Sequence, residues 1–444
     1  MVRQIADVLI ICALKDEFNQ LLDVSEGLIS DGWAKSRTTG GRTIAQAVFE
    51  GATGAQVSVM ATWLSYMGRE QTQAVLTEIV LSHNIRCLAM TGICAGRRGS
   101  VELGDVIFAD RLYSYDSGKS VVTEGIRTFK ADPIQYRPPL PWVQCMQEVS
   151  FTQDEDWLEG RPALSLEYQE NWVLSRLLEG TTPHHHIDFT EECPNWPDVV
   201  QRLWKRGWVT EQMVLREEGR AHIERLMTVY PSGLPRDNEF SIHIAPMATG
   251  ASVVEDEDIF DFLSYSNRKV LGLDMEASGL AASSEVLRLP FVVAKGVSDF
   301  ADTHKDDRYR LFAARASAEA AIQLLRKADH LLSKQEHRAG KEQHPQSSFP
   351  AAVSPSVTDR ELLEVLADLY PDVGEIRSVW ELAGGKRHEV ENTSNPRNIW
   401  QSLLRRSCLG GSVNLSKLVE VVLADYPNNE FLLGRLKELR ESQE

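Results

Sequence analysis

The sequence predicts an α/β fold followed by a small all-α bundle, and two observations carry this prediction. In the first 330 residues or so, continuous apolar runs typical of buried strands in a mixed or parallel sheet alternate with stretches of helical periodicity. Beyond residue 356 the pattern is helical throughout. At 444 residues the chain is too long for one ordinary core, and its length favours about two or three domains.

The expected elements of the α/β domain follow one another along the chain. Helical periodicity predicts helices at 69–83 and 276–288, and an alanine-rich helix at 308–332 ends the domain. Apolar runs predict strands at 8–14, 57–62, 86–90, 105–109, 270–273 and 291–294. This alternation predicts helices layered against a sheet, in a domain that covers residues 1–332.

A region from about 130 to 240 interrupts this rhythm, with several tryptophans and prolines and mostly helical patterning. We expect an insertion within the α/β domain. Residues 198–209 and 215–223 faintly resemble a winged-helix fragment. The formal charge of −17 opposes nucleic-acid binding, however, because a phosphate backbone attracts basic surfaces. A helical lid over the active site is the favoured interpretation.

The C-terminal part begins after a polar stretch at 333–356, which is rich in Gln, Lys, His, Ser and Pro. Such a composition buries too little apolar surface to fold alone, so a linker is predicted. Apolar residues then recur at helical spacing through 357–444, with prolines at Pro371 and Pro427 stopping two helices. We expect about five short helices without a polar cluster that suggests catalysis.

The cysteines and the first apolar run bear on metal binding and location. Six cysteines are scattered along the chain, without a Cys-x-x-Cys motif or histidines at metal spacing, which favours a reducing cytoplasm and predicts no metal site. The run at 8–14 lies between Asp7 and the charged residues 15–17. It is too short and too acidic for a signal peptide or a membrane span, so we expect no membrane association.

Two acidic motifs are the strongest candidates for a site. Asp274 and Glu276 close one expected strand, and Asp299 follows the next strand after one helix length. A strand–helix–strand unit would place these carboxylates on the same rim of a sheet. In open α/β sheets, ligands bind in the crevice outside the carboxyl ends of the strands.

Four segments that contain these acids occur together in one order: residues 10–17, 91–97 with 103–105, 248–253, and the surroundings of Glu276 and Asp299. Jointly they resemble the purine and uridine phosphorylase superfamily, and within it the methylthioadenosine/S-adenosylhomocysteine nucleosidase branch. The resemblance covers roughly residues 5–125 and 240–330. It implies a nucleoside phosphorylase-like α/β/α sandwich that acts on nucleosides.

The resemblance also implies roles for individual residues. Asp299 matches the acid that protonates the purine base, Glu276 the carboxylate that holds the ribose hydroxyls, and Met275 the apolar contact under the sugar. Glu17 matches the position that orients the attacking water, although Lys15 and Asp16 depart from the acidic run of the family. The alternatives are structural: a helix cap for Asp299, a first-turn acid for Glu276 and a solvated turn for Glu17.

Further substrate contacts are expected around the glycine-rich turn and in the other matching segments. The expected contacts are Cys94, Ala95, Gly96, Arg97, Val253 and Ser298. Cys94 is equally well explained as a buried structural thiol. Arg97, with Arg98, is of the type that holds phosphate, either as a co-substrate or on a nucleotide, but both suit an ordinary solvated surface as well.

The C-terminal helices carry a second resemblance. Residues 369–372, 376–380, 398–403 and 426–428 resemble the effector-associated adaptor domains of bacterial conflict systems. This implies a protein partner, recruited through the helical domain at 357–444. A structural appendage or an oligomerisation bundle is the alternative.

Taken together, the residues and the two resemblances predict a cytoplasmic N-ribosyl hydrolase that cleaves a purine nucleoside or nucleotide without a cofactor. The domain pairing implies an effector that depletes a nucleotide pool in bacterial defence, and the family implies a homo-oligomer. Two alternatives remain: a phosphorylase with phosphate as co-substrate, and a non-catalytic nucleotide-sensing or adaptor protein.

Overall fold

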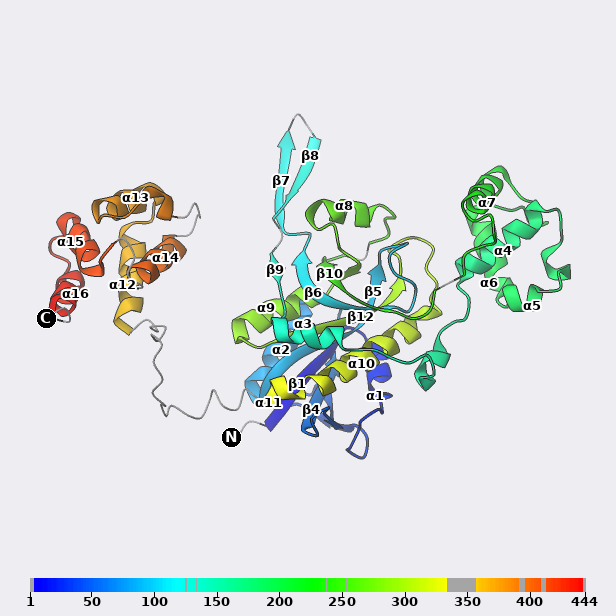
Figure 1. Ribbon diagram of the computed structural model, residues 1–444, viewed down its shortest axis with the longest axis horizontal. Helices are drawn as coiled ribbons and strands as arrows, with labels where there is room; N and C mark the ends of the chain where they lie inside the picture. The colour runs from blue at the N-terminus through cyan, green and yellow to red at the C-terminus, as the bar shows by residue number, and fades with distance from the viewer. Residues whose placement is uncertain are drawn as a thin grey trace. The chain divides into compact units, whose positions relative to one another are not determined.

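A computed structural model of the protein describes residues 4–123, 126–132, 134–236, 238–252, 254–333, 357–390, 396–408 and 413–441. The chain forms two compact units, Met1–Lys341 and Glu342–Glu444. We call them the α/β unit and the C-terminal unit, and we describe each by itself (Figure 1).

The α/β unit is built on one large mixed sheet, whose strands run in the order β11-β10-β6-β12-β5-β1-β4-β3-β2, with β9 pairing β6. All six apolar runs form strands of this sheet, as predicted. The strands are β1 (Gln4–Cys12), β2 (Ala34–Arg37), β3 (Thr43–Glu50), β4 (Gln56–Trp63), β5 (His83–Gly96), β6 (Val106–Ser114), β9 (Gln135–Tyr136), β10 (Ile242–Thr249), β11 (Gly272–Asp274) and β12 (Phe291–Asp299).

The centre of the sheet is parallel, since β1 pairs with β4 and β5, and β5 pairs with β12, in the same direction. Strand β12 then pairs antiparallel with β6, which runs parallel to β10. Short β11 pairs parallel with the end of β10 and antiparallel with the end of β5, where Leu273 faces Ala95. The sheet therefore closes on itself through β11, β10, β6, β12 and β5. This closure brings together the ends of β1, β5, β11 and β12.

This closure corrects one expectation from the sequence. We expected β11, the following helix and β12 to form one strand–helix–strand unit of a shared sheet rim. The two strands do not pair, because the end of β5 lies between them and runs antiparallel to β11 but parallel to β12. The acids that follow them still converge, but they do so across β5.

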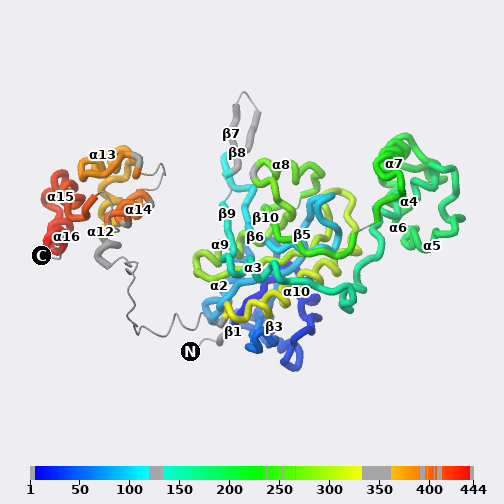
Figure 2. The backbone as a smooth tube through the Cα atoms, viewed as in Figure 1, coloured from blue at the N-terminus to red at the C-terminus, as the bar shows by residue number. Residues whose placement is uncertain are grey.

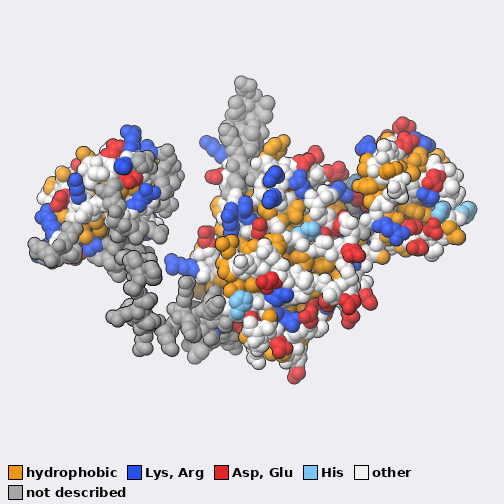
Figure 3. Space-filling view, viewed as in Figure 1, with side chains coloured by type: hydrophobic (Ala, Val, Ile, Leu, Met, Phe, Trp, Pro, Cys, Tyr) orange, Lys and Arg blue, Asp and Glu red, His pale blue; other side chains and the backbone are white. Residues whose placement is uncertain are grey.

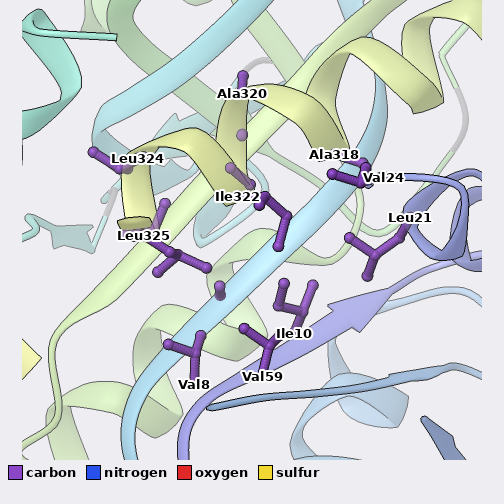
Figure 4. Close-up of a cluster of buried hydrophobic side chains, with 14 of the residues drawn as sticks. Val8, Ile10, Leu21, Val24, Val59, Ala318, Ala320, Ile322, Leu324 and Leu325 are labelled. Carbon is purple, nitrogen blue, oxygen red and sulfur yellow. The ribbon is translucent and has the colours of Figure 1, made fainter. Parts of the chain in front are cut away.

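Helices cover both faces of the sheet, and two apolar clusters fill the space beneath them. On one face Val8 and Ile10 of β1 pack under α1 (Lys15–Leu22) and α10 (Tyr309–Lys327), as Figure 4 shows. Alternate β1 residues such as Leu9 point to the other face, under α2 (Arg69–Ser82) and α9 (Ala277–Leu287). The helices predicted at 69–83, 276–288 and 308–332 are thus present, the last continuing into α11 (Asp329–Ser333).

Between β9 and β10 lies a mostly helical insertion, in the region where the sequence pattern changes. Its helices α4, α6 and α7 form a group of their own in Figure 2, with a separate apolar cluster around Trp172, Leu203 and Ile223. The helical segments are α3 (Leu140–Gln147), η1 (Asp156–Gly160), α4 (Leu166–Leu178), η2 (Pro183–His185), α5 (Phe189–Glu192), α6 (Trp196–Arg206) and α7 (Glu217–Val229). Outside this insertion the unit has a separate hairpin, β7 (Gly118–Thr123) with β8 (Ile126–Ala131), and one further helix, α8 (Ile259–Ser266).

The C-terminal unit is helical, with a core around the fully buried Trp380 and Trp400. Asp372 caps α13 by accepting hydrogen bonds from the N–H groups of Gly374 and Glu375 at 2.7 and 3.3 Å. Its helical segments are α12 (Val357–Leu369), α13 (Val373–Leu382), η4 (Arg387–Glu389), α14 (Pro396–Cys408), α15 (Leu415–Asp425) and α16 (Glu430–Glu441). The predicted fold class, α/β followed by a helical region, is confirmed, whereas residues 334–356 of the predicted linker lie outside the described residues.

Candidate active site

A cavity of about 200 Å³ opens where the ends of β1, β5, β11 and β12 meet. It brings together seven of the ten residues expected at the site. The predicted residues that line it are Glu17, Cys94, Ala95, Met275, Glu276, Ser298 and Asp299. The remaining lining is Ala13, Leu14, Met67, Ile93, Ser252, Val254, Leu273, Asp274 and Lys305.

Glu17 lies in the first turn of α1, directly after β1, and only 3% of it is exposed. Its Oε2 accepts a hydrogen bond from the Leu14 N–H, and its Oε1 accepts one from the Ile93 N–H, both at 3.0 Å. Burial raises the pKa of Glu17, while Lys295 and these N–H groups act in the opposite direction. Glu17 is therefore a fixed part of the cavity wall rather than the solvated turn that was its alternative.

The glycine-rich turn has a specific reason for its glycine at residue 92. Gly92 has φ +143°, and a Cβ at this position would lie 2.6 Å from the carboxylate of Glu17. A side chain here would push Glu17 out of the cavity wall. The Gly92 N–H also donates to the Ser317 hydroxyl of α10 at 3.0 Å, which holds the turn against the helix.

Glu276 stands at the corner between β11 and α9 and is 4% exposed. Its Oε1 accepts a hydrogen bond from the Gly68 N–H at 3.1 Å, at the start of α2. Burial raises the pKa of Glu276 to about 7, with Asp274 and Glu17 adding to the increase and Lys295 opposing it. This acid titrates in the neutral range because it is buried among other acids.

Asp274 has a different position from Glu276, although the two are only two residues apart. Its Oδ1 accepts a hydrogen bond from Thr249 Oγ1 at 2.8 Å, and its Oδ2 accepts one from the Ala277 N–H at 3.0 Å. These bonds tie the end of β11 to β10 and to the first turn of α9. Asp274 therefore builds the corner on which Glu276 stands.

Lys295 is a member of this cluster that the sequence prediction missed. It lies in β12, is fully buried, and its Nζ is 3.4 Å from Asp274 Oδ2 and 3.8 Å from Glu276 Oε2. Burial alone would lower the pKa of Lys295, but the carboxylates of Asp274, Glu276 and Glu17 outweigh burial and raise it. The available signal was a lysine inside an otherwise apolar strand, since a buried ammonium group needs anionic partners.

Asp299 ends β12 and is only partly buried. Its Oδ2 accepts a hydrogen bond from the Ser298 hydroxyl at 2.9 Å, and its Oδ1 accepts one from the Ala301 N–H at 2.9 Å. Ala301 has φ +60°, an unusual value for a residue with a side chain, so the backbone turns sharply here. The turn aims the carboxylate into the cavity instead of capping α10, which begins ten residues later.

The smaller contacts divide between the cavity and its surroundings. Cys94, Ala95 and Met275 line the cavity, and burial raises the pKa of the Cys94 thiol, so this cysteine stays protonated and is no candidate nucleophile. Gly96 is buried in the pairing of β5 with β11, outside the cavity lining. Val253 lies outside the described residues.

The arginine pair does not lie in the cavity. Arg97 donates to Asp261 Oδ1 and to the Arg268 carbonyl, each at 3.3 Å, and Arg98 bridges Glu167 of the insertion and Asp302, both at 2.5 Å. These guanidinium groups are turned toward acids on the outside of the β5 end. The structure thus does not bring Arg97 to the substrate contacts with which it was grouped.

The cavity combines three chemical capacities. Asp299 offers a partly exposed carboxyl group. Glu276 offers a buried carboxyl group whose Oε2 accepts no hydrogen bond from the described residues, and Glu17 offers a second buried carboxyl group in the same lining. Within the described part of the chain, no group of three or more His, Cys, Asp or Glu side chains is arranged to hold a metal ion. The same residues contain no helix that is both long and apolar enough to cross a membrane.

Comparisons with solved structures give similar folds at low identity. The α/β part is similar to futalosine hydrolase of Helicobacter pylori strain 26695, at 12% identity and a TM-score of 0.42, over 72% of this chain and 97% of that one. The 5′-methylthioadenosine/S-adenosylhomocysteine nucleosidase of Neisseria meningitidis has 13% identity and a TM-score of 0.42, over 72% and 98%. The MTA/SAH nucleosidase of Streptococcus pneumoniae has 17% identity and a TM-score of 0.43, over 72% and 99%.

Sequence comparisons add one relative and one family. The uncharacterized protein y4jS of Sinorhizobium fredii (strain NBRC 101917 / NGR234) is 26% identical over 269 residues, which make up 60% of this chain. The chain spans about half the length of this curated relative, covering 49% of it. Residues 356–440 match the family described as Effector-associated domain 1, which confirms the second resemblance found in the sequence.

Proposed function

We propose that the α/β unit is an N-ribosyl hydrolase that cleaves the bond between a purine base and ribose in a nucleoside or nucleotide. The observation that carries this proposal is the convergence of Glu17, Glu276 and Asp299 in one cavity from three separate parts of the chain. Glycosidic cleavage needs a proton for the departing base, an anion near the sugar and a positioned nucleophile. The three acids can supply one each.

Asp299 is the proposed general acid. Protonation of the base makes it a better leaving group, and a positioned carboxyl group can supply that proton. The Ser298 hydroxyl and the Ala301 N–H hold the carboxylate in one orientation. Ala95 of β5 and Ser252 of the segment after β10 line the same cavity.

Glu276 is the proposed ribose anchor. Its Oε1 is held by the Gly68 N–H, and its Oε2 remains to accept hydrogen bonds from sugar hydroxyls. As the bond to the base breaks, positive charge develops at the anomeric carbon, and a nearby carboxylate stabilises it. Met275 provides the apolar surface beneath the sugar.

Glu17 is the proposed water-positioning base. Each of its oxygens accepts one backbone N–H, which leaves further acceptor positions for a water molecule. The attacking water transfers a proton to this carboxylate as it bonds to the anomeric carbon. The ammonium group of Lys295 lies 3.4 Å from Asp274 Oδ2 and 3.8 Å from Glu276 Oε2, so this lysine acts on the site through the acids and is a positioning residue.

Hydrolysis is favoured over phosphorolysis by the charge of the cavity. Its lining contains four acids, namely Glu17, Asp274, Glu276 and Asp299, and a single lysine. A phosphate ion at the sugar would face this concentration of negative charge, whereas a neutral water would not. The arginines that suggested phosphate, Arg97 and Arg98, are engaged with Asp261, Glu167 and Asp302 outside the cavity.

The match to effector-associated domain 1 supports an effector role for this activity. We propose that the C-terminal unit recruits a protein partner, and that the α/β unit then depletes a purine nucleoside or nucleotide pool. Cytoplasmic location, homo-oligomerisation and action without a cofactor stay predictions. A non-catalytic sensor is the alternative of a different class.

A product analysis tests this proposal. The full-length protein is incubated with purine nucleosides and nucleotides, with and without inorganic phosphate, and the free base and sugar are identified by chromatography. We expect free base and a sugar without a 1-phosphate, independent of added phosphate, and no base from the Glu276→Ala control. A sugar 1-phosphate that requires added phosphate would establish phosphorolysis instead. Tight binding of a nucleotide without any base release would favour the sensor.

A further inference from the structure

A second cleft, of about 560 Å³, adjoins the candidate active site. It lies between α6 of the insertion and the segment 303–308, which follows Asp299. The basic residues that line it are Arg202, Lys205, Arg206, Lys305 and Arg308. The proposed catalytic roles leave this cleft without a function.

Lys305 connects the two spaces. It lines the cavity that holds Glu17, Glu276 and Asp299, and it also lines the cleft beside α6. It is the single basic side chain in the lining of the cavity, within the part of the chain that the structure describes. The cavity and the cleft therefore adjoin at Lys305.

The cleft has an excess of basic groups in an acidic protein. Five lysines and arginines line it against three aspartates, whereas acids outnumber lysine and arginine by 64 to 47 in the whole chain. His304 adds no charge at neutral pH, because burial lowers its pKa. Figure 3 shows acidic and basic side chains mixed over the face of the α/β unit that it presents, so a local excess of one sign is notable.

Two of the arginines fix the shape of the cleft. Arg202 and Arg206 both pair with the buried Glu170, at 2.5 and 3.2 Å. Arg202 also donates to the carbonyl oxygens of Lys305 and His304, at 2.8 and 3.1 Å. This network ties α6 to the segment after Asp299, with two guanidinium groups sharing one buried carboxylate in the wall of the cleft.

Two lysines are available to a ligand. Lys205 is exposed and makes no hydrogen bond or ion pair with the residues that the structure describes. Lys305 pairs with Glu255 at 3.2 Å, and more than half of the Glu255 side chain is exposed. Such a surface ion pair contributes little to stability, so a phosphate can replace Glu255 at little cost.

We infer that this cleft binds the 5′-phosphate groups of the substrate, so that the protein acts on nucleotides in preference to nucleosides. The inference rests on the proposed function, which places the base at Asp299 and the ribose at Glu276. A substituent on the 5′ carbon must then leave the cavity, and Lys305 marks an exit toward positive charge. Lysine and arginine form charge-assisted hydrogen bonds with phosphate oxygens, and the net charge of −17 disfavours phosphate over much of the remaining surface.

Kinetics on one base series test the inference. Release of adenine from adenosine, AMP, ADP and ATP is measured with the full-length protein. We expect kcat/KM for AMP to exceed that for adenosine by about ten-fold or more, because one charge-assisted hydrogen bond is worth at least this factor. Equal kcat/KM values for adenosine and AMP would overturn the inference and leave the proposed hydrolase standing.

Two variants localise the effect. Lys205→Gln and Lys305→Gln should each reduce the ratio of kcat/KM for AMP to that for adenosine by about five-fold. Lys35→Gln is the matched control, because Lys35 is exposed on β2 at the opposite end of the sheet, and it should leave the ratio unchanged. A preference for AMP that both cleft variants retain would place the phosphates elsewhere and contradict this site.

A binding measurement separates failure of this inference from failure of the hydrolase proposal. Formycin A and its 5′-phosphate have a carbon–carbon glycosidic bond that resists hydrolysis, so calorimetry reports their affinity without turnover. We expect the phosphate to bind about ten-fold more tightly than formycin A, and Lys205→Gln to reduce this difference. If that holds without base release from any nucleotide, the phosphate site stands, while cleavage and the preference in cleavage fail. If the two bind equally, or neither binds, the phosphate site is wrong.

Discussion

The acids of the cavity occupy two contrasting environments. Glu17, Asp274 and Glu276 are buried around the ammonium group of Lys295, while Asp299 is partly exposed and is held by Ser298 and a turn of its own backbone. The buried group behaves as one unit, because each charge depends on the others for its stability. Asp299 is separable from that unit, so its removal should affect chemistry without affecting folding.

This contrast assigns different tasks to acids that look alike in the sequence. A buried carboxylate beside a lysine is suited to a constant role, such as holding the sugar or orienting water. A partly exposed carboxylate at the mouth of the cavity can take up a proton again after each turnover, as a general acid must. Substitutions in the two environments should therefore have different effects on stability and activity.

Lys295→Met should have the largest effect. It leaves three buried carboxylates without their cation, and breaking a buried ion pair from one side costs about 3–5 kcal/mol. We expect a loss of stability of that size in urea unfolding of the full-length protein, together with loss of activity. The deficit should be larger at pH 8 than at pH 5, because the unpaired acids are ionised at the higher pH.

Lys35→Met on the exposed strand β2 is the control and should change the free energy of unfolding by less than about 0.5 kcal/mol. Lys295→Arg should retain much of the stability, since it keeps the positive charge. A change of under about 1 kcal/mol for Lys295→Met would mean that the three acids are not held by this lysine.

Asp299→Asn should come next, with an effect on activity alone. Loss of a general acid lowers kcat by about 10²–10⁴-fold. Stability should stay within about 0.5 kcal/mol, because asparagine can still accept the hydrogen bond from the Ala301 N–H at a partly exposed position. Measuring kcat beside the unfolding midpoint checks both parts. A kcat within a few-fold of the wild type would return Asp299 to its alternative role as a structural turn residue.

The sequence predicted the acids better than it predicted their surroundings. The strands that carry them were evident, because β1, β5, β11 and β12 are apolar on both faces and bounded by Gly or charged residues. Lys295 was missed, because a lysine after residues 291–294 looks like the end of a strand. Its meaning depends on three acids that come from elements up to 278 residues away, at Glu17, and spacing along the chain does not reveal such a cluster.

Arg97 shows the same limit of prediction from sequence, because it was predicted at the site but does not line the cavity. Its position after a glycine-rich turn is correct for a ligand contact, but the direction of its guanidinium group depends on the pairing of β5 with β11 and on Asp261 of α8. The closure of the sheet that creates this pairing is a tertiary property. Local sequence therefore located the rim of the sheet but not which side chains turn into the cavity.

Glu276→Gln should change stability less than Lys295→Met does, and it should stabilise the protein rather than destabilise it. Burial raises the pKa of Glu276 from its ordinary 4.5 to about 7 in the folded protein. The folded state therefore binds more protons than the unfolded state between these values, and wild-type stability falls as pH rises from about 4.5 through 7. Glutamine resembles the protonated acid and avoids this cost. We expect the variant to be more stable than the wild type by about 1–3 kcal/mol at pH 8, with little difference at pH 5.

The activity of Glu276→Gln should fall although its stability rises, since the variant loses the anion at the sugar. The kcat of the wild type should rise with pH through about 7 as Glu276 ionises. Glu50→Gln, at the exposed end of β3, is the control and should change stability by less than about 0.5 kcal/mol at either pH. If Glu276→Gln is instead destabilising at pH 8, attraction to Lys295 outweighs burial. Glu276 would then be a structural partner of the lysine, in the manner of Asp274, and not an anion kept in the cavity at the expense of stability.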